Sequence, residues 1–135
     1  MEVTDILAKL AAHTGSFPRK AINAAVEKRE EITPELLRIL GEAYSWELDY
    51  DENEKESLNK SFLCQYALFL LAQFRETRAY TLVIRLAHLP ERKLDDLISD
   101  TITEYLDRIL ASVCGGDTSL IEDLIEDLAQ ALDQI

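Results

Sequence analysis

Apolar residues recur at helical spacing along almost the whole chain, and no segment alternates strictly between apolar and polar residues. Helices place apolar residues three and four positions apart, whereas half-buried strands place them two apart. The pattern therefore predicts an almost entirely α-helical protein of about seven short helices. We expect one domain over 1–135, with N-terminal helices in 1–48, an acidic loop at 49–57 and stacked helix pairs in 58–135.

Residues that begin or end helices lie between these apolar runs. The first helix is expected to end at His13, Thr14 and Gly15, where glycine supplies a left-handed turn. Thr33 followed by Pro34 predicts the start of a third helix, because the hydroxyl can cap it and the missing N–H of proline costs nothing at the first helical position.

A helix from about Leu58 to Arg75 is apolar nearly all round, so it must be covered on several sides. Pro90 starts a short helix through Ile98, and Thr101 with Glu104 forms a capping box for the next one.

The last helix is expected to begin after Gly115 and Gly116, with Asp117 or Thr118 as its cap. Its apolar residues form one stripe opposite the acids, and the residues of that stripe that can reach a partner are Ile121, Ile125, Leu128, Leu132 and Ile135. The simpler interpretation is that the preceding helix pair covers this stripe. Alternatively, the stripe binds a partner or a second copy of the chain and forms a homo-oligomer.

The charge is strongly negative, with 26 acidic and 14 basic residues and a net charge of -12. Arg108 is the last basic residue, and six acids follow it. Phosphate backbones and anionic membranes repel such a protein, so we expect no nucleic-acid or membrane partner. Cys64 and Cys114 lie in apolar helical contexts, which suits buried thiols in a reducing cytoplasm.

Motifs for metal binding and catalysis are incomplete. Asp49, Asp51 and Asn53 match the first three ligands of a calcium loop, but Glu54 replaces the glycine and Lys60 the final carboxylate. We therefore expect a solvated acidic loop. The sequence predicts no catalytic residue, no metal site and no cofactor, and so no enzyme.

Hydrogen-bond donors concentrate in the elbow FRETRAY and the helix that follows: Arg75, Arg78, Tyr80, Arg85 and His88. They would receive a carboxylate or phosphate of a partner if the elbow is a binding site. In the simpler interpretation the arginines pair with nearby acids and Tyr80 packs. The hypothesis is that Arg75, Arg78 and Tyr80 bind a protein partner, with Trp46 and Tyr50 as aromatic anchors beside the acidic loop.

Internal repetition is suggested by a shift of 39 residues, which aligns residues of the same class. A period of about 40 is typical of HEAT and armadillo repeats. Three segments also resemble an uncharacterised bacterial family with HEAT-like helical repeats: TGSFPRKAINAAVEKREEITPELLRIL (Thr14 to Leu40), LLAQFRETRAYTLVIRL (Leu70 to Leu86) and RILASVCGGD (Arg108 to Asp117).

The resemblance implies a cytoplasmic bacterial helical solenoid and supplies no catalytic residues. Family members usually continue with further repeats, and some end in a cysteine-rich zinc motif, neither of which follows Asp117 here. We expect a non-enzymatic protein interaction or scaffold module. The alternatives are a self-associating structural protein that uses the C-terminal stripe, or an enzyme with no recognisable motif.

Overall fold

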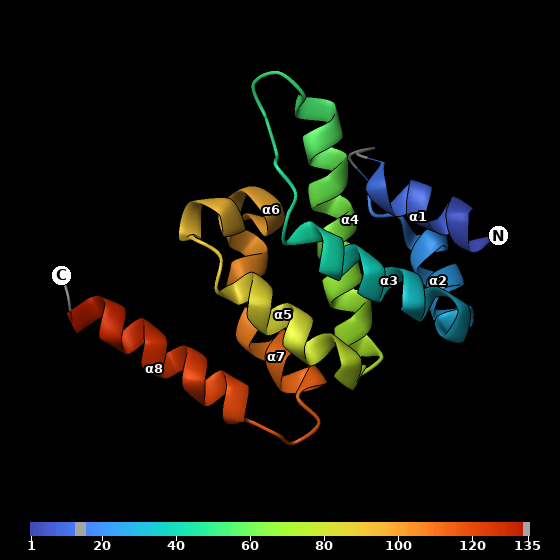
Figure 1. Ribbon diagram of the computed structural model, residues 1–135. Helices are drawn as coiled ribbons and strands as arrows, with labels where there is room; N and C mark the ends of the chain where they lie inside the picture. Colours follow the sequence, from blue (N-terminus) through green and yellow to red (C-terminus); the bar gives the residue numbers. More distant parts are fainter. Residues whose placement is uncertain (13–15, 134–135) are drawn as a thin grey trace.

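The computed structural model describes residues 1–12 and 16–133, and all regular structure in these residues is helical. The described residues form eight α-helices and one short 3-10 helix, η1. Figure 1 shows how the α-helices are arranged in space. Their bounds are α1 (Val3–Ala11), α2 (Arg19–Glu27), α3 (Arg29–Ala43), α4 (Glu54–Gln73), η1 (Thr77–Ala79), α5 (Tyr80–Ala87), α6 (Glu91–Thr103), α7 (Leu106–Val113) and α8 (Ser119–Asp133). The all-α prediction is confirmed, with eight helices in place of about seven. The predicted helix end at residues 13–15 lies outside the described residues.

The central element is α4, which packs against α1 and α3 and also against α6 and α7 (Figure 1). Cys64, Leu68 and Leu71 of this helix are at most 1% exposed. A helix that is apolar nearly all round can be stable only when neighbours enclose it. The expectation that this segment is covered on several sides is confirmed.

The start of α3 differs from the prediction. This helix begins at Arg29, so Pro34 lies in its second turn instead of at its first position. The hydroxyl of Thr33 is buried and donates to the carbonyl of Arg29 at 2.6 Å. Ile32 is fully buried, and burial of this side chain against the core favours an earlier helix start than the local proline signal indicates.

The predicted acidic loop is shorter than 49–57, because α4 already begins at Glu54. Glu54 and Glu56 lie in the first helical turn, where the helix dipole favours negative charge. Before it, one carboxylate oxygen of Asp49 accepts hydrogen bonds from the backbone N–H groups of Asp51 and Glu52, each at 3.0 Å. The carboxylate of Asp49 therefore holds a turn.

Two backbone irregularities shape the C-terminal half. Ser99 has φ 62° and ψ 162° and kinks α6 close to the predicted helix break after Ile98. The helix predicted to start at Thr101 is itself interrupted, because α6 ends at Thr103 and α7 begins at Leu106. Gly115 and Gly116 have φ values of 62° and 86° and follow α7, which confirms their predicted role as a helix end. The carboxylate of Asp117 then accepts from the N–H of Ser119 at 3.0 Å and caps α8.

The last helix, α8, packs mainly on α5 and extends away from the rest of the molecule (Figure 1). α5 has 8 residues and α8 has 15, so at 1.5 Å per residue α5 is too short to cover the whole length of α8. The expectation that the preceding helices cover the whole stripe is therefore wrong.

Candidate interaction surfaces

Arg75 ends α4 in a left-handed conformation, with φ 53°. Its N–H donates to the carbonyl of Ala72 and the N–H of Glu76 donates to that of Leu71, both at 3.0 Å. These two bonds form a Schellman motif, in which glycine is the usual residue at the left-handed position. The guanidinium of Arg75 is exposed and has no hydrogen-bond or ion-pair partner among the described residues.

Arg78 binds its own neighbour in the chain. Its Nε lies 2.8 Å from Oε1 of Glu76, and both side chains belong to the elbow. This bonding lowers the pKa of the Glu76 carboxyl below its ordinary value. The pairing of an elbow arginine with a nearby acid was the simpler interpretation of the cluster, and it holds for Arg78.

Tyr80 is 6% exposed, and its hydroxyl accepts a hydrogen bond from the N–H of Ile121 at 3.3 Å. His88, at the other end of α5, places Nε2 3.3 Å from Oδ2 of Asp127. Both side chains therefore contact α8. The prediction that Arg75, Arg78 and Tyr80 bind a partner stays a prediction, but Tyr80 offers a partner little surface.

Trp46 and Tyr50 lie at the opposite end of α5 from the elbow. Trp46 lines a groove of about 370 Å³ whose other wall includes Leu89, Pro90 and Leu97. The hydroxyl of Tyr50 donates to the backbone carbonyl of Asp96, another lining residue. The structure therefore does not bring the two predicted groups of site residues together, and their role as aromatic anchors stays a prediction.

Two arginine side chains donate hydrogen bonds to the C-terminal ends of helices that lie more than 40 residues away in the sequence. The guanidinium of Arg29 donates to the carbonyl of Phe74 and lies 5.1 Å from the centre of its ring. Arg85 donates to the carbonyl of Gly41 at 2.7 Å and stacks over Tyr44 at 4.6 Å. Cations favour helix C-termini because the last carbonyl groups are unpaired and partly negative. Arg85 therefore stabilises α3.

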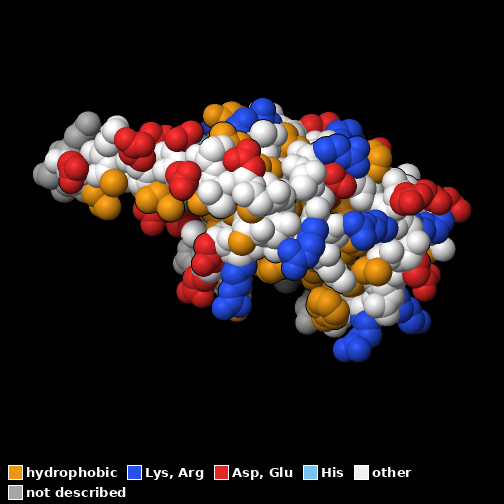
Figure 2. All heavy atoms as spheres, turned by 90° about the horizontal axis from the view of Figure 1, so that it is seen from below, with side chains coloured by type: hydrophobic (Ala, Val, Ile, Leu, Met, Phe, Trp, Pro, Cys, Tyr) orange, Lys and Arg blue, Asp and Glu red, His pale blue; other side chains and the backbone are white. Residues whose placement is uncertain are grey.

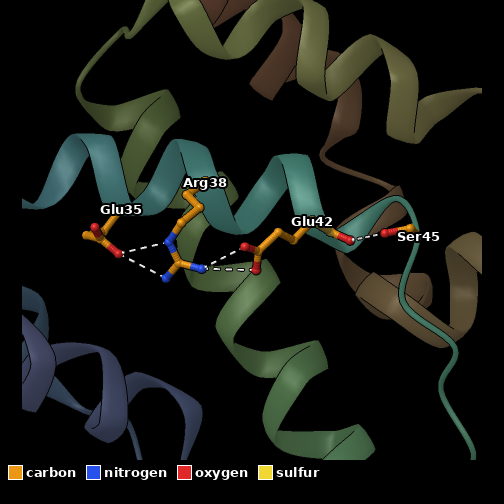
Figure 3. A network of polar contacts seen from close by, with 4 residues as sticks. All are labelled: Glu35, Arg38, Glu42 and Ser45. Carbon is orange, nitrogen blue, oxygen red and sulfur yellow. Dashed lines mark hydrogen bonds and ion pairs between the residues drawn. The ribbon is translucent and has the colours of Figure 1, made fainter.

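An exposed ion network runs along α3. Figure 3 shows Arg38 between Glu35 and Glu42, at 2.9 and 3.0 Å, with Ser45 bonded to the carbonyl of Glu42. The hydrogen bonds that Arg38 donates to Glu35, and then those to Glu42, raise the pKa of Arg38. The spacing of three and four residues could have revealed this network from the sequence. Exposed pairs of this kind stabilise little, so the network is a solvated face.

The two cysteines differ in environment. Burial raises the pKa of the Cys64 thiol to about 12, which makes its nucleophilic thiolate scarce. Cys114 is half-buried, and its thiol donates to the carbonyl of Ala111 at 3.4 Å. Within residues 1–12 and 16–133, no group of three or more histidine, cysteine or acidic side chains is arranged to hold a metal ion. Over the same residues, no helix combines the length and apolar character needed to cross a bilayer.

Three exposed large apolar side chains of the described residues lie on α8. Leu124 is buried, at 8% exposure, whereas Ile125, Leu128 and Leu132 are 60%, 56% and 68% exposed. Figure 2 shows apolar side chains along this helix where it extends from the body, with acids beside them. We call Ile125, Leu128 and Leu132 the α8 face. Ile135, the last residue of the predicted stripe, lies outside the described residues.

A comparison with family models matches residues 1–131 of this chain to a family of proteins of unknown function, DUF1186. The chain belongs to the DUF1186 family. All eight helices of the described chain therefore begin within the family region, α8 included.

Curated relatives of the chain occur in two Chlamydia species. An uncharacterized protein of Chlamydia muridarum is 45% identical over 126 residues, which cover 93% of this chain and 48% of the relative. An uncharacterized protein of Chlamydia trachomatis serovar D is 44% identical over 126 residues, which again cover 93% of this chain and 48% of the relative. The chain thus spans about half the length of the curated relatives it matches. No solved structure matches it significantly.

Proposed function

We propose that this chain is a non-enzymatic protein-interaction module of the bacterial cytoplasm, with helix pairs stacked in the manner of HEAT repeats. The observation that carries the proposal is the α8 face, where three large apolar side chains on one helix are more than half exposed. Contiguous exposed apolar side chains rimmed by polar residues are a known mark of interaction sites on soluble proteins. Burying one such side chain fully contributes roughly 1.5–3 kcal/mol.

The chemistry of the titratable groups supports a non-enzymatic role. Shifted pKa values at active sites usually reflect groups that converge on a pocket. Here the shifts have local structural causes: Glu76 is bonded to Arg78, and Asp117 is bonded to Ser119 at the start of α8. The thiol of Cys64 is shifted by burial in the central helix. The cytoplasmic location rests on the two free cysteines.

Self-association is the second candidate function, because two copies could cover each other's α8 face. An enzyme whose motif is unfamiliar is a third, and no specific contact of the described residues favours it. Both interaction functions predict that binding requires the α8 face. The elbow hypothesis predicts instead that binding requires Arg75 and Arg78.

The test is affinity capture from bacterial cytosol at low and moderate salt. The native chain is compared with Leu128→Ser/Leu132→Ser, with Arg75→Ala/Arg78→Ala, and with the matched control Phe17→Ser/Val26→Ser, which removes two exposed apolar side chains elsewhere. We expect the native chain and the control to capture the same cytosolic protein. The α8 variant should fail to capture it. Retention of the same proteins by the α8 variant, with an unchanged circular dichroism spectrum, would show that the α8 face is not the binding surface.

A further inference from the structure

The α8 face has a defined direction on the helix. Ile125, Leu128 and Leu132 are spaced by three and four residues, so they share one side over two turns. Leu124 and Asp127 lie on the neighbouring side and contact the body, Leu124 by burial and Asp127 through His88 at 3.3 Å. The α8 face lies beside this contacting side, and the exposure of its three side chains shows that docking of α8 on the body leaves it uncovered.

One edge of the α8 face carries acids. Glu122, Glu126 and Asp133 follow each other at intervals of four and seven residues, so they line one edge, and each is exposed. Leu124, which is buried against the body, forms the other edge. Because no lysine or arginine follows Arg108 in the sequence, no basic side chain of α8 offsets these charges.

We propose that the partner of the α8 face is an amphipathic helix whose apolar stripe is bordered by lysine or arginine. This proposal rests on the proposed function and names the partner class for the same surface. Helices pack at interaxial distances of about 8–10 Å, which brings the side chains at the edges of the two stripes within reach of each other. A basic border then pairs with Glu122, Glu126 and Asp133, while the apolar stripes bury one another.

A second copy of the chain does not fit the same surface. An antiparallel pair of α8 helices brings the two acidic edges together, so carboxylates lie opposite carboxylates. A parallel pair brings the acidic edge of one copy against the Leu124 edge of the other, which the body of that copy already covers. Repulsion at such distances survives physiological salt, where the screening length is about 8 Å. Charge at the edges of paired helices selects the partner, and here it selects against self-pairing.

The experiment uses two synthetic helical peptides with the same leucine stripe, one with lysine at its edges and one with glutamate. We expect the native chain to bind the lysine-edged peptide at least about tenfold more tightly by fluorescence anisotropy, with the difference shrinking as salt rises. The variant Glu122→Lys/Glu126→Lys should reverse the preference. The same reversal in the exposed loop, Asp51→Lys/Glu52→Lys, should leave the preference in place.

Three outcomes overturn the proposal. Unchanged binding of the lysine-edged peptide by Leu128→Ser/Leu132→Ser, or an equal loss in the loop variant, would mean that only general negative charge attracts the peptide. The native chain could also sediment as a dimer while the Leu128→Ser/Leu132→Ser variant sediments as a monomer. That result would assign the α8 face to a second copy of the chain.

Failure of this inference and failure of the proposed function are separable. If cytosolic capture depends on the α8 face but neither peptide is preferred, the interaction function stands and the partner class is wrong. If capture does not depend on the α8 face, the proposed function itself fails.

Discussion

α4 and α8 are both rich in leucine, yet α4 is enclosed by its neighbours and α8 is mostly open. Leu68 of α4 is 1% exposed, whereas Leu128 of α8 is 56% exposed. The apolar residues of α4 point in all directions, so several helices must surround it, and α1, α3, α6 and α7 do so. The apolar residues of α8 form a stripe, and α5 contacts only one border of it. The comparison shows that α4 forms the core of the protein, whereas α8 leaves apolar side chains exposed to solvent.

The largest expected effect on stability comes from a matched pair of leucine substitutions, one in α4 and one in α8. Leu68→Ala should destabilise the protein by about 2–5 kcal/mol, because it opens a cavity in the core. Leu128→Ala should change stability by no more than about 0.5 kcal/mol, because its side chain is exposed. Urea unfolding followed by circular dichroism measures both. Equal losses would mean that α8 is enclosed in solution.

The turn that leads into α8 gives the next largest effect. Gly115→Ala should cost roughly 1–2 kcal/mol, because an L-residue is strained at positive φ. An added Cβ would also lie 2.9 Å from Cγ2 of Thr77. Gly116→Ala is the control, since its φ is also positive but no atom lies within 4 Å of the added Cβ. The difference between their unfolding free energies reports the contact with Thr77, and no difference would show that this contact relaxes freely.

The attachment of α8 to the body depends in part on one hydroxyl. Tyr80→Phe removes the acceptor of the Ile121 N–H, which should cost about 0.5–1.5 kcal/mol. Hydrogen exchange of the Ile121 amide should accelerate, while the amides in the middle of α4 keep their protection. Faster exchange in α4 as well would show that the two helices unfold together.

The end of α4 carries a removable strain. Arg75→Gly should stabilise the protein by about 0.5–1 kcal/mol, because glycine adopts the left-handed conformation of the Schellman motif without a Cβ penalty. Arg75→Ala removes the charge and keeps the strain, so it should bring no such gain. Thermal unfolding of the two variants compares them, and equal Tm values would show that the guanidinium and not the backbone is responsible.

The smallest expected effect is a pH dependence at the same helix end. The folded pKa of Glu76 lies below its ordinary value of 4.5, mainly because of its bonds to Arg78. Its contribution is therefore present above that value and is lost as the pH falls through the folded pKa. Glu76→Gln should make stability slightly less sensitive to pH over this acid range in urea unfolding. An unchanged slope would show that the Arg78 pairing contributes nothing in solution.

Local signals in the sequence predicted much of the fold. The helical class, the enclosed central helix and the glycine end of α7 all follow from spacing and turn chemistry within a few residues. The start of α3 did not follow, because burial of Ile32 outweighed the signal of Pro34. Stacking of the helices as HEAT-like repeats stays a prediction.

The candidate surfaces were less predictable. The sequence pattern groups Arg85 with the donors of the elbow, but its guanidinium donates to the carbonyl of Gly41, 44 residues away. Arg29 and Phe74 are 45 residues apart. No local spacing encodes such contacts, because they exist only once α3, α4 and α5 are packed together.

For α8, the sequence by itself determined the amphipathic helix, the single apolar stripe and its acidic edge, since all three follow from helical periodicity. Only the tertiary structure decided which part of the stripe is covered. That outcome depends on the length and position of α5, whose 8 residues reach along only part of the 15 residues of α8. Ile125, Leu128 and Leu132 stay exposed because their neighbour is short and packs against another side of the helix.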